Sequence, residues 1–389
     1  MTDLAMRVAP ARSEALRRAA PALLGYAAVR ALGLLALTLW SAVRDKDAYT
    51  LLTARWDALW YTRVAELGYG YEVHMPNGDV HSNLAFFPLL PWLERLVAEV
   101  SPLSYADGGF VVSLLASFAA AWGVFAVADH VYGRRAGVCA VLLWAALPVG
   151  IVQSMAYSES LFTALAAWSL YAVLTGRWIT AGTLALLAGL TRPVGLAVVA
   201  AVWVAGIASF ARDRSTPPGP HGARHVTRAL GLFLAPLGVA GYVLWVGHRT
   251  GKGPLGYLDV QAGWRNGFDG GYAFARFVAE KFTSFPSALA GVGLIIGVGL
   301  LVWLYIVGVR QGQPLPLLVY GGVVTALALC ASSYFGSKPR LLLPAFPLLL
   351  PLAISLSRLR TRRSAGVLAG LAVASAVYGA FWLNGSGPP

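Results

Sequence analysis

The sequence has few charged residues and almost no cysteine. Asp, Glu, Lys and Arg together make up 12% of the 389 residues, whereas the water-facing surface of a soluble domain needs about 25–35% charged residues. The low charge therefore excludes a soluble globular protein. The two cysteines, Cys139 and Cys330, both lie in apolar stretches, which indicates small buried residues rather than a disulfide or a metal pair.

The sequence contains several long apolar runs. Hydrophobic residues make up 58% of the sequence, the mean hydropathy is +0.65, and about 20 apolar residues are enough to cross a bilayer as a helix. We predict an all-α polytopic membrane protein that forms a single domain over residues 1–389 and has about 11 transmembrane helices. The predicted spans are 20–43, 109–132, 136–152, 159–175, 178–191, 193–210, 229–248, 286–309, 315–333, 340–357 and 364–383. The turn at Thr191–Pro193 is alternatively a break in one long helix.

The basic residues are distributed asymmetrically along this topology. Lys and Arg concentrate on the cytoplasmic side of a membrane. With the N-terminus inside, the inner segments contain 16 Lys and Arg and four acidic residues, whereas the outer segments contain 13 of each sign. We therefore predict a cytoplasmic N-terminus at 1–19, a cytoplasmic loop at 211–228, and long outer loops at 44–108 and 249–285. The same asymmetry explains the pI of about 10.0 without nucleic acid as a partner.

The first outer loop, 44–108, carries a predicted amphipathic helix. From Arg55 to Glu72 apolar and aromatic side chains recur every three or four residues, which predicts a helix at the extracytoplasmic membrane surface. Gly68 is a normal C-terminal stop for this helix. Asp57 therefore lies at the start of a helix at the interface.

A second interfacial helix is expected later in the same loop. Its first turn is placed at Pro88 or Pro91, because proline is favoured at the start of a helix. Phe86 and Phe87 precede it, and we interpret them as aromatic anchors in the membrane interface.

Several short blocks of the sequence carry a resemblance to a known family. The blocks are Trp56–Ala58, Ala65–Glu66, Gly68–Tyr69, Ala85–Pro88 with Pro91, Tyr157–Phe162 (YSESLF), Thr191–Gly195 (TRPVG) and Pro339–Pro344 (PRLLLP). Through them the sequence resembles the PIG-V family, the GPI mannosyltransferase II type of enzyme, and its bacterial relatives. The blocks extend over most of the chain, from about 55 to 347. The sequence departs from the family pattern where VHMPNGDVHS is inserted after Glu72.

The resemblance implies a GT-C glycosyltransferase fold with an extracytoplasmic active site. The shared module of that superfamily has large outer loops after its first and seventh spans, which correspond here to 44–108 and 249–285. The implied reaction is an inverting transfer of mannose from polyprenyl-phosphate mannose to a hydroxyl group, so the chain would be a hexosyltransferase of the mannosyltransferase type. The lipid phosphate is already a good leaving group, so a carboxylate base and cations for the phosphate suffice. Neither a cofactor nor a metal is expected.

The resemblance also implies the partners and the location. The partners are membrane lipids, the polyprenyl-phosphate-linked sugar donor, and a lipid or glycan acceptor. The abundance of Ala, Gly and Arg suggests a high-GC bacterium, where a GPI precursor is not the expected acceptor. We therefore expect a multi-pass protein of the bacterial cell membrane.

Asp57 is the candidate catalytic base. It is acidic, it starts the predicted surface helix, and a positioned carboxylate can take the proton of the acceptor hydroxyl. The alternative is an N-cap that only starts the helix. Trp56 beside it can stack on a sugar. Glu72, in the same region, is a candidate for substrate binding.

Glu159 and three cations complete the candidate site. Glu159 enters the fourth predicted span from outside, where a carboxylate is costly unless it is paired or in a wet cavity; the alternative is a capping role beside Ser158. Arg192, Lys338 and Arg340 lie at the outer ends of predicted spans and are candidates for binding the donor phosphate. The alternative for these cations is snorkelling to lipid headgroups.

Other polar residues are weaker candidates. The triplet Asp45–Asp47 resembles the DxD pattern that some glycosyltransferases use with a metal, but a charged cluster is expected at the end of any span. Arg30, within the first span, is expected to be paired or to snorkel. The remaining candidates, for acceptor or donor contacts, are His74, His81, Trp264, Arg265 and Asp269.

A lipid or sugar-lipid transporter is the alternative function. A carrier usually shows matching broken helices in two halves and polar residues near the middle of the membrane. This sequence has no internal repeat and gathers its acids and aromatic residues in the outer loops. The pattern favours an enzyme over a transporter, and over a third interpretation, a polytopic assembly protein without chemistry.

Overall fold

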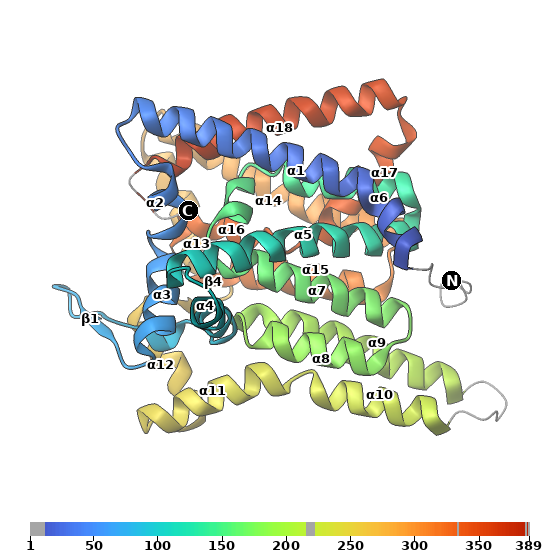
Figure 1. The fold of residues 1–389 in the computed structure, drawn as a ribbon, viewed down its shortest axis with the longest axis horizontal. Coiled ribbons are helices and arrows are strands. Elements are labelled where there is room, and N and C mark those ends of the chain that lie inside the picture. The colour runs from blue at the N-terminus through green and yellow to red at the C-terminus, as the bar shows by residue number, and fades with distance from the viewer. Residues whose placement is uncertain (1–11, 215–221, 333, 386, 388–389) are drawn as a thin grey trace.

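The computed structural model describes residues 12–214, 222–332, 334–385 and 387. Figure 1 shows long helices that run roughly in one direction, with most of the short helices and the strands gathered at one end of the bundle. The predicted cytoplasmic segments 1–19 and 211–228 lie partly outside the described residues.

Six helices of the described ranges are long and apolar enough to cross a membrane. They are α1 (Arg12–Val43), α5 (Tyr105–Tyr132), α9 (Leu196–Arg214), α10 (Gly222–Leu234) continued by α11 (Leu237–Thr250), α14 (Ser287–Arg310) and α18 (Thr361–Leu383). Shorter apolar helices are α7 (Ser158–Leu174), α8 (Trp178–Gly189) and α15 (Leu315–Cys330). The chain is thus a helical protein that crosses the membrane several times.

The count of eleven spans is not confirmed. Each predicted segment contains a helix, but α6 (Arg134–Ala145) and α8 have only 12 residues each, and a straight span needs about 20. The tenth segment is bent by 74° between η7–α16 (Phe335–Ser337 and Lys338–Leu341) and η8–α17 (Phe346–Leu349 and Leu350–Arg358), and counts as a seventh span only if the two parts are taken together. Prolines explain the breaks, since they remove an N–H and clash with the preceding turn.

The chain turns sharply at the Thr191–Pro193 position. After α8 it forms a short 3₁₀ helix, η4 (Pro193–Gly195), and returns as α9. Figure 1 shows α8 and α9 side by side. Gly195 of η4 packs closely against Gly189 at the end of α8. A Cβ on Gly195 would lie only 2.6 Å from the Cα of Gly189, so this contact requires a glycine. The structure therefore has two helices here rather than one long broken helix.

The first outer loop is built of short elements. It contains α2 (Ala48–Thr53), α3 (Asp57–Leu67), the antiparallel strands β1 (Glu72–His74) and β2 (Val80–Ser82), η2 (Asn83–Ala85) and α4 (Leu89–Val100). The predicted helix of this loop ends at Gly68 as expected, and the second begins directly after Pro88. The inserted segment forms the β1–β2 hairpin, which projects from the bundle in Figure 1.

The second outer loop lies at the same end of the bundle (Figure 1). It contains η5 (Gly253–Leu255), α12 (Gly256–Gly263), β3 (Gly267–Phe268), α13 (Tyr272–Glu280) and η6 (Lys281–Thr283). Strand β3 pairs with β4 (Ala331–Ser332), directly after α15. The two long loops therefore meet over the ends of the same helices.

Phe86 and Phe87 are not membrane anchors. Both are buried: Phe86 stacks on Trp60 with ring centroids 5.6 Å apart, and Phe87 packs on Tyr242 at 4.4 Å. Aromatic side chains of the two loops and α11 offer them more contact area than the interface would. The prediction for these two residues was wrong, and they hold the loop elements together.

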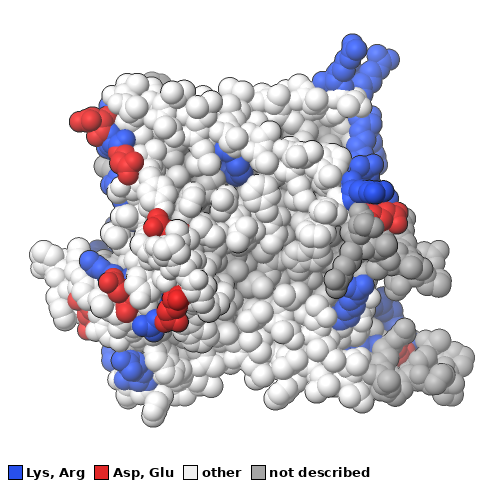
Figure 2. All heavy atoms as spheres, viewed as in Figure 1, with Lys and Arg blue, Asp and Glu red and all other residues white. Residues whose placement is uncertain are grey.

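The charges separate toward the two ends of the bundle. Figure 2 shows Lys and Arg concentrated at one end and both signs at the end with the outer-loop elements, with few charged side chains between them. Arg30 in α1 is buried and donates to the backbone carbonyls of Ala145 and Gly150. Of the two alternatives predicted for Arg30, pairing and snorkelling, the structure shows pairing. The carbonyls lie around the break between α6 and η3 (Gly150–Ser154).

Candidate active site

Asp57 is the first residue of α3 and points into the molecule. The residue before it, Trp56, takes the N-cap position with φ 52° and ψ −123°, a backbone conformation that is strained for any residue except glycine. Asp57 is therefore not the N-cap of its helix. Its carboxylate lies 2.8 Å from Nη1 of Arg340 instead.

Glu159 lies in the first turn of α7 and is 1% exposed. Its Oε1 is 2.6 Å from Nη1 of Arg192 and 3.2 Å from Nε of Arg340. Charges this deeply buried persist only when they are paired. The capping role considered for Glu159 is thus secondary to two ion pairs.

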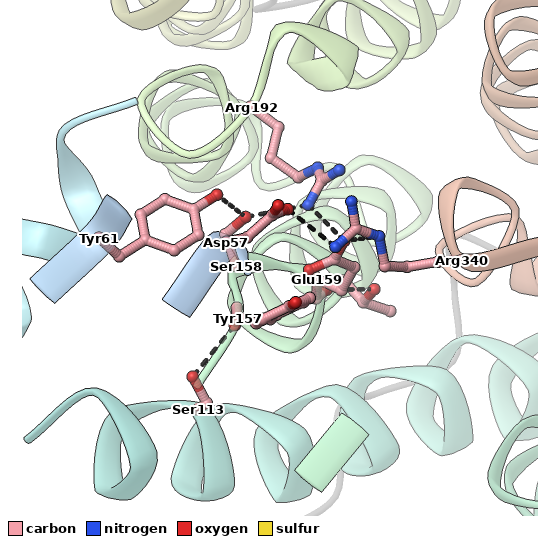
Figure 3. Close-up of polar contacts among 9 residues, drawn as sticks. Asp57, Tyr61, Ser113, Tyr157, Ser158, Glu159, Arg192 and Arg340 are labelled. Carbon is pink, nitrogen blue, oxygen red and sulfur yellow. Dashed lines mark hydrogen bonds and ion pairs between the residues drawn. The ribbon is translucent and has the colours of Figure 1, made fainter. Parts of the chain in front are cut away.

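The structure brings four of the seven predicted site residues into one cluster. We call Asp57, Glu159, Arg192 and Arg340 the carboxylate–guanidinium cluster (Figure 3). They come from α3, α7, the turn before η4, and α16. Their formal charges are two negative and two positive, so the cluster is neutral as a whole. Because these charges cancel, four ionised groups can lie together in one partly buried site.

Three further side chains surround the cluster, and the sequence had not indicated a role for them. Tyr61 Oη lies 2.7 Å from Ser158 Oγ, to which Arg192 also donates at 3.0 Å. Arg340 lies 5.0 Å from the ring centroid of Tyr157. Figure 3 shows these groups arranged around the carboxylates. The available signal for Tyr61 is its spacing, since it is one helical turn beyond Asp57 and so shares its face of α3.

Tyr61 is a neutral hydroxyl group in this environment. It is buried, and the loss of solvent raises its pKa, although the cation of Arg192 opposes this rise. A phenol that stays protonated can still exchange hydrogen bonds with Ser158. It therefore ties α3 to the first residue of α7.

Backbone contacts fix the loop elements on the helix ends. The N–H of Leu89, at the start of α4, donates to the carbonyl of Leu190, two residues before Arg192, and the N–H of Ala156 donates to the carbonyl of Leu52 in α2. Ser113 of α5 donates to the carbonyl of Tyr157. The first outer loop thus positions both the arginine turn and the start of α7.

The other three predicted site residues lie outside the cluster contacts. Lys338 is buried, but its Nζ donates to the carbonyls of Ala328 and Ala331 at the end of α15. This arrangement caps a helix C-terminus. Trp56 lies beside Asp57 with its ring 4.2 Å from the guanidinium of Arg55, and Glu72 is exposed in β1.

The weaker candidates have structural contacts. Asp47 caps α2, and its bonds from Thr50 lower its pKa. Lys46 donates to the carbonyl of Asn384, and Asp269 accepts from the backbone N–H groups of Gly271 and Ala273 at the start of α13.

The second-loop candidates pack on the inserted hairpin. Trp264 stacks on His81 with centroids 4.1 Å apart, Arg265 pairs with Asp79 at 2.6 Å, and His74 is exposed at the end of β1. Within the described ranges, no three His, Cys, Asp or Glu residues group as metal ligands would. Independence from metal stays a prediction.

An apolar cavity of about 190 Å³ lies beside the segment that carries Arg340. Pro339, Leu342 and Leu343 line it together with Leu301 and Leu304 of α14. Its lining thus includes residues that precede and follow Arg340 in the sequence, Pro339 and Leu342.

A comparison with protein families gives a match in the first part of the chain. Residues 41–213 match the family Mannosyltransferase (PIG-V). The matched segment contains Asp57, Glu159 and Arg192, and it supports the predicted enzyme class, a mannosyltransferase. The match covers less than half of the chain and ends at residue 213, so Arg340 lies beyond it. None of the curated proteins compared with the chain matches it in sequence.

Solved structures similar to the chain show the fold. The crystal structure of ArnT from Cupriavidus metallidurans bound to undecaprenyl phosphate is 15% identical, with a TM-score of 0.50, over 92% of this chain and 62% of ArnT. The apo state of the same protein is 14% identical, with the same TM-score and coverage. This level of identity shows a shared fold alone. The chain corresponds to 62% of the length of ArnT.

Proposed function

We propose that the chain is an inverting mannosyltransferase that moves mannose from a polyprenyl-phosphate donor to a hydroxyl group of a lipid or glycan acceptor. The observation that carries the proposal is the carboxylate–guanidinium cluster, in which two arginines meet two acids under the first outer loop. The PIG-V match supports mannose as the sugar. The transporter alternative has no comparable support.

The arginines provide the site for the donor phosphate. A guanidinium can bind phosphate through two parallel N–H groups. Arg192 and Arg340 converge on Glu159, so a phosphate at this place would meet both of them. The apolar cavity lined by Pro339 and Leu342, close to Arg340 in the sequence, offers a surface for the first part of a prenyl chain. The undecaprenyl phosphate in the ArnT crystal structure is a ligand of this chemistry.

Asp57 provides the base. Its carboxylate stands at the edge of the cluster, 26% exposed, at the start of a loop helix, where an acceptor hydroxyl can approach. The acceptor oxygen attacks the anomeric carbon from the side opposite the phosphate, its proton passes to Asp57, and the sugar–phosphate bond breaks. Attack from the opposite face inverts the anomeric centre. Arginines at the departing phosphate stabilise its charge.

The orientation follows from the charge distribution. We place the end with the outer-loop elements outside the cell, because the opposite end carries the excess of Lys and Arg (Figure 2). The location is then the cell membrane of a bacterium, with the active site extracytoplasmic.

A direct assay tests the function. Purified protein is incubated with polyprenyl-phosphate mannose and a membrane lipid extract, and the mannosylated product is identified by mass spectrometry. We expect one class of lipid or glycan to gain a hexose only when the donor is present. Donor that is never consumed, in extracts from several bacteria, would remove mannosyl transfer as the function.

A further inference from the structure

Arg340 is shared between two carboxylates. Its Nη1 lies 2.8 Å from Asp57 and its Nε 3.2 Å from Glu159, and its side chain is 8% exposed. Within the cluster, two acids already balance two arginines. A phosphate that arrives with its own negative charge would therefore make the site net negative, and burying an uncompensated charge is costly.

Release of one carboxylate from Arg340 removes this conflict. With one acid withdrawn, the remaining groups carry one net positive charge, which matches the single negative charge of a phosphodiester. The question is then which acid leaves. The two carboxylates differ enough in their surroundings to answer it.

Asp57 is the acid that can leave. Glu159 is 1% exposed and is also held by Arg192 at 2.6 Å. Asp57 is 26% exposed, and Arg340 is its ion-pair partner in the described part of the chain. It also follows Trp56, whose backbone is strained at φ 52°, so the start of α3 stores energy that a rearrangement can release.

We propose that Asp57 holds the anion position on Arg340 that the donor phosphate takes, so that donor binding itself frees the catalytic base. This inference rests on the proposed function and adds its regulation. In the empty site the base is tied to a cation. When the phosphate replaces it, the carboxylate can turn to the acceptor, which makes binding ordered, with the donor first.

The same exchange explains how the product leaves. During transfer the bond from the acceptor oxygen to the anomeric carbon forms, the bond from that carbon to the phosphate oxygen breaks, and the acceptor proton moves to Asp57. Protonated Asp57 is neutral and cannot compete for Arg340. Once it gives the proton to water, its carboxylate returns to Arg340 and displaces the lipid phosphate.

Binding of a product analogue tests the exchange without any transfer reaction. Farnesyl phosphate is titrated into the full chain in detergent by isothermal titration calorimetry, for the wild type, Asp57→Asn, Asp57→Ala and the control Glu66→Gln, which removes an exposed acid from the same helix. We expect both Asp57 variants to bind more tightly, by about fivefold, because a competing ion pair is gone. Glu66→Gln should stay within about twofold of the wild type, since surface charges contribute little.

The outcomes separate this inference from the proposed function. Affinity that is unchanged or weaker in an Asp57 variant that melts like the wild type would overturn the exchange, because it would make the Asp57–Arg340 pair a support for the arginine. If Asp57→Asn does not fold, Asp57→Ala decides. No binding by any variant would instead argue against a lipid-phosphate site, and so against the proposed function.

Discussion

Two buried arginines at different ends of the bundle are held in different ways. Arg228 of α10 pairs with Asp213 of α9 at 2.7 Å, and its guanidinium also contacts the rings of Trp178 and Phe210. Its partner is only 15 residues away in the sequence. Arg340 contacts two acids, from α3 and α7, that are far away in the sequence.

The difference distinguishes structural support from a reactive site. The pair between Arg228 and Asp213 joins two consecutive helices and so fixes their packing. The cluster around Arg340 has a shared cation, a partly exposed acid and a strained residue, Trp56, beside it. In the proposed exchange, a phosphate takes the place of one of the two acids on this shared cation, which a site that binds and releases an anion requires.

The first prediction tests whether the two ends face opposite sides of the membrane. A reporter fused after Arg363, just inside α18, should read cytoplasmic, and one fused at Pro389 extracytoplasmic, because α18 separates the two points. The measurement pairs alkaline phosphatase with a cytoplasmic fluorescent protein. Both reporters active on one side would mean that α18 does not cross, and would put the orientation in question.

The next largest effect is expected at Asp57. Asn keeps the size of Asp but cannot accept a proton at neutral pH, so Asp57→Asn should lower the transfer rate by about 10²–10⁴-fold, the usual contribution of a general base. The thermal midpoint in detergent should change little. A variant that keeps more than about a tenth of the activity would place the base elsewhere.

Asp213→Asn is the matched change at the other arginine. It leaves Arg228, 1% exposed, without its charged partner, and breaking a buried pair costs about 3–5 kcal/mol in stability, less here because Asp213 is partly exposed. We expect a lower thermal midpoint with the turnover of the folded fraction unchanged. A selective loss of turnover with normal stability would erase the distinction between the two arginines.

Sequence reasoning reached the cluster through the chemistry of single residues. Asp57 stood out as an acid at the start of a predicted surface helix, Glu159 as a carboxylate at membrane depth, and Arg192 and Arg340 as cations at the outer ends of predicted spans. The pairs of Arg340 with Asp57 and Glu159 join segments more than 100 residues apart, which no local pattern encodes. The carbonyl partners of Lys338 are likewise set by how α15 ends, and its role at the donor phosphate stays a prediction.

The fold shows the same limit. Every segment that hydropathy predicted contains a helix, but hydropathy measures composition and cannot tell a full span from a shorter apolar helix packed in the bundle. The boundaries at Gly68 and Pro88 were predictable because they depend on local backbone chemistry. Phe86 and Phe87 were misplaced, because an aromatic residue suits both an interface and a core.

A smaller effect on activity than that of Asp57→Asn is expected at the two arginines of the cluster. Arg192→Ala or Arg340→Ala removes a charge-assisted hydrogen bond to the donor phosphate, a loss of about 1.5–3 kcal/mol. The concentration of donor needed for half-maximal rate should therefore rise more than that of the acceptor. Initial rates with each substrate varied in turn give the answer. Equal changes for both substrates would assign the arginines to holding the fold, as Arg228 does.

The smallest effect is expected at Tyr61, which connects α3 to α7 without a charge. Tyr61→Phe removes the hydroxyl 2.7 Å from Ser158 but keeps the buried ring against Phe86, so the loss should be that of one neutral hydrogen bond, about 0.5–1.5 kcal/mol. Because Ser158 also receives the guanidinium of Arg192, Arg192 then loses part of its fixed position. We expect a rise in the donor requirement of less than about tenfold, measured from initial rates, with little change in acceptor requirement.

Trp60→Phe, a change in the same helix away from Ser158, is the control for altered aromatic packing. A loss as large as that of Asp57→Asn would show that Tyr61 takes part in the proton transfer, and that the reactive region extends beyond the four charged residues.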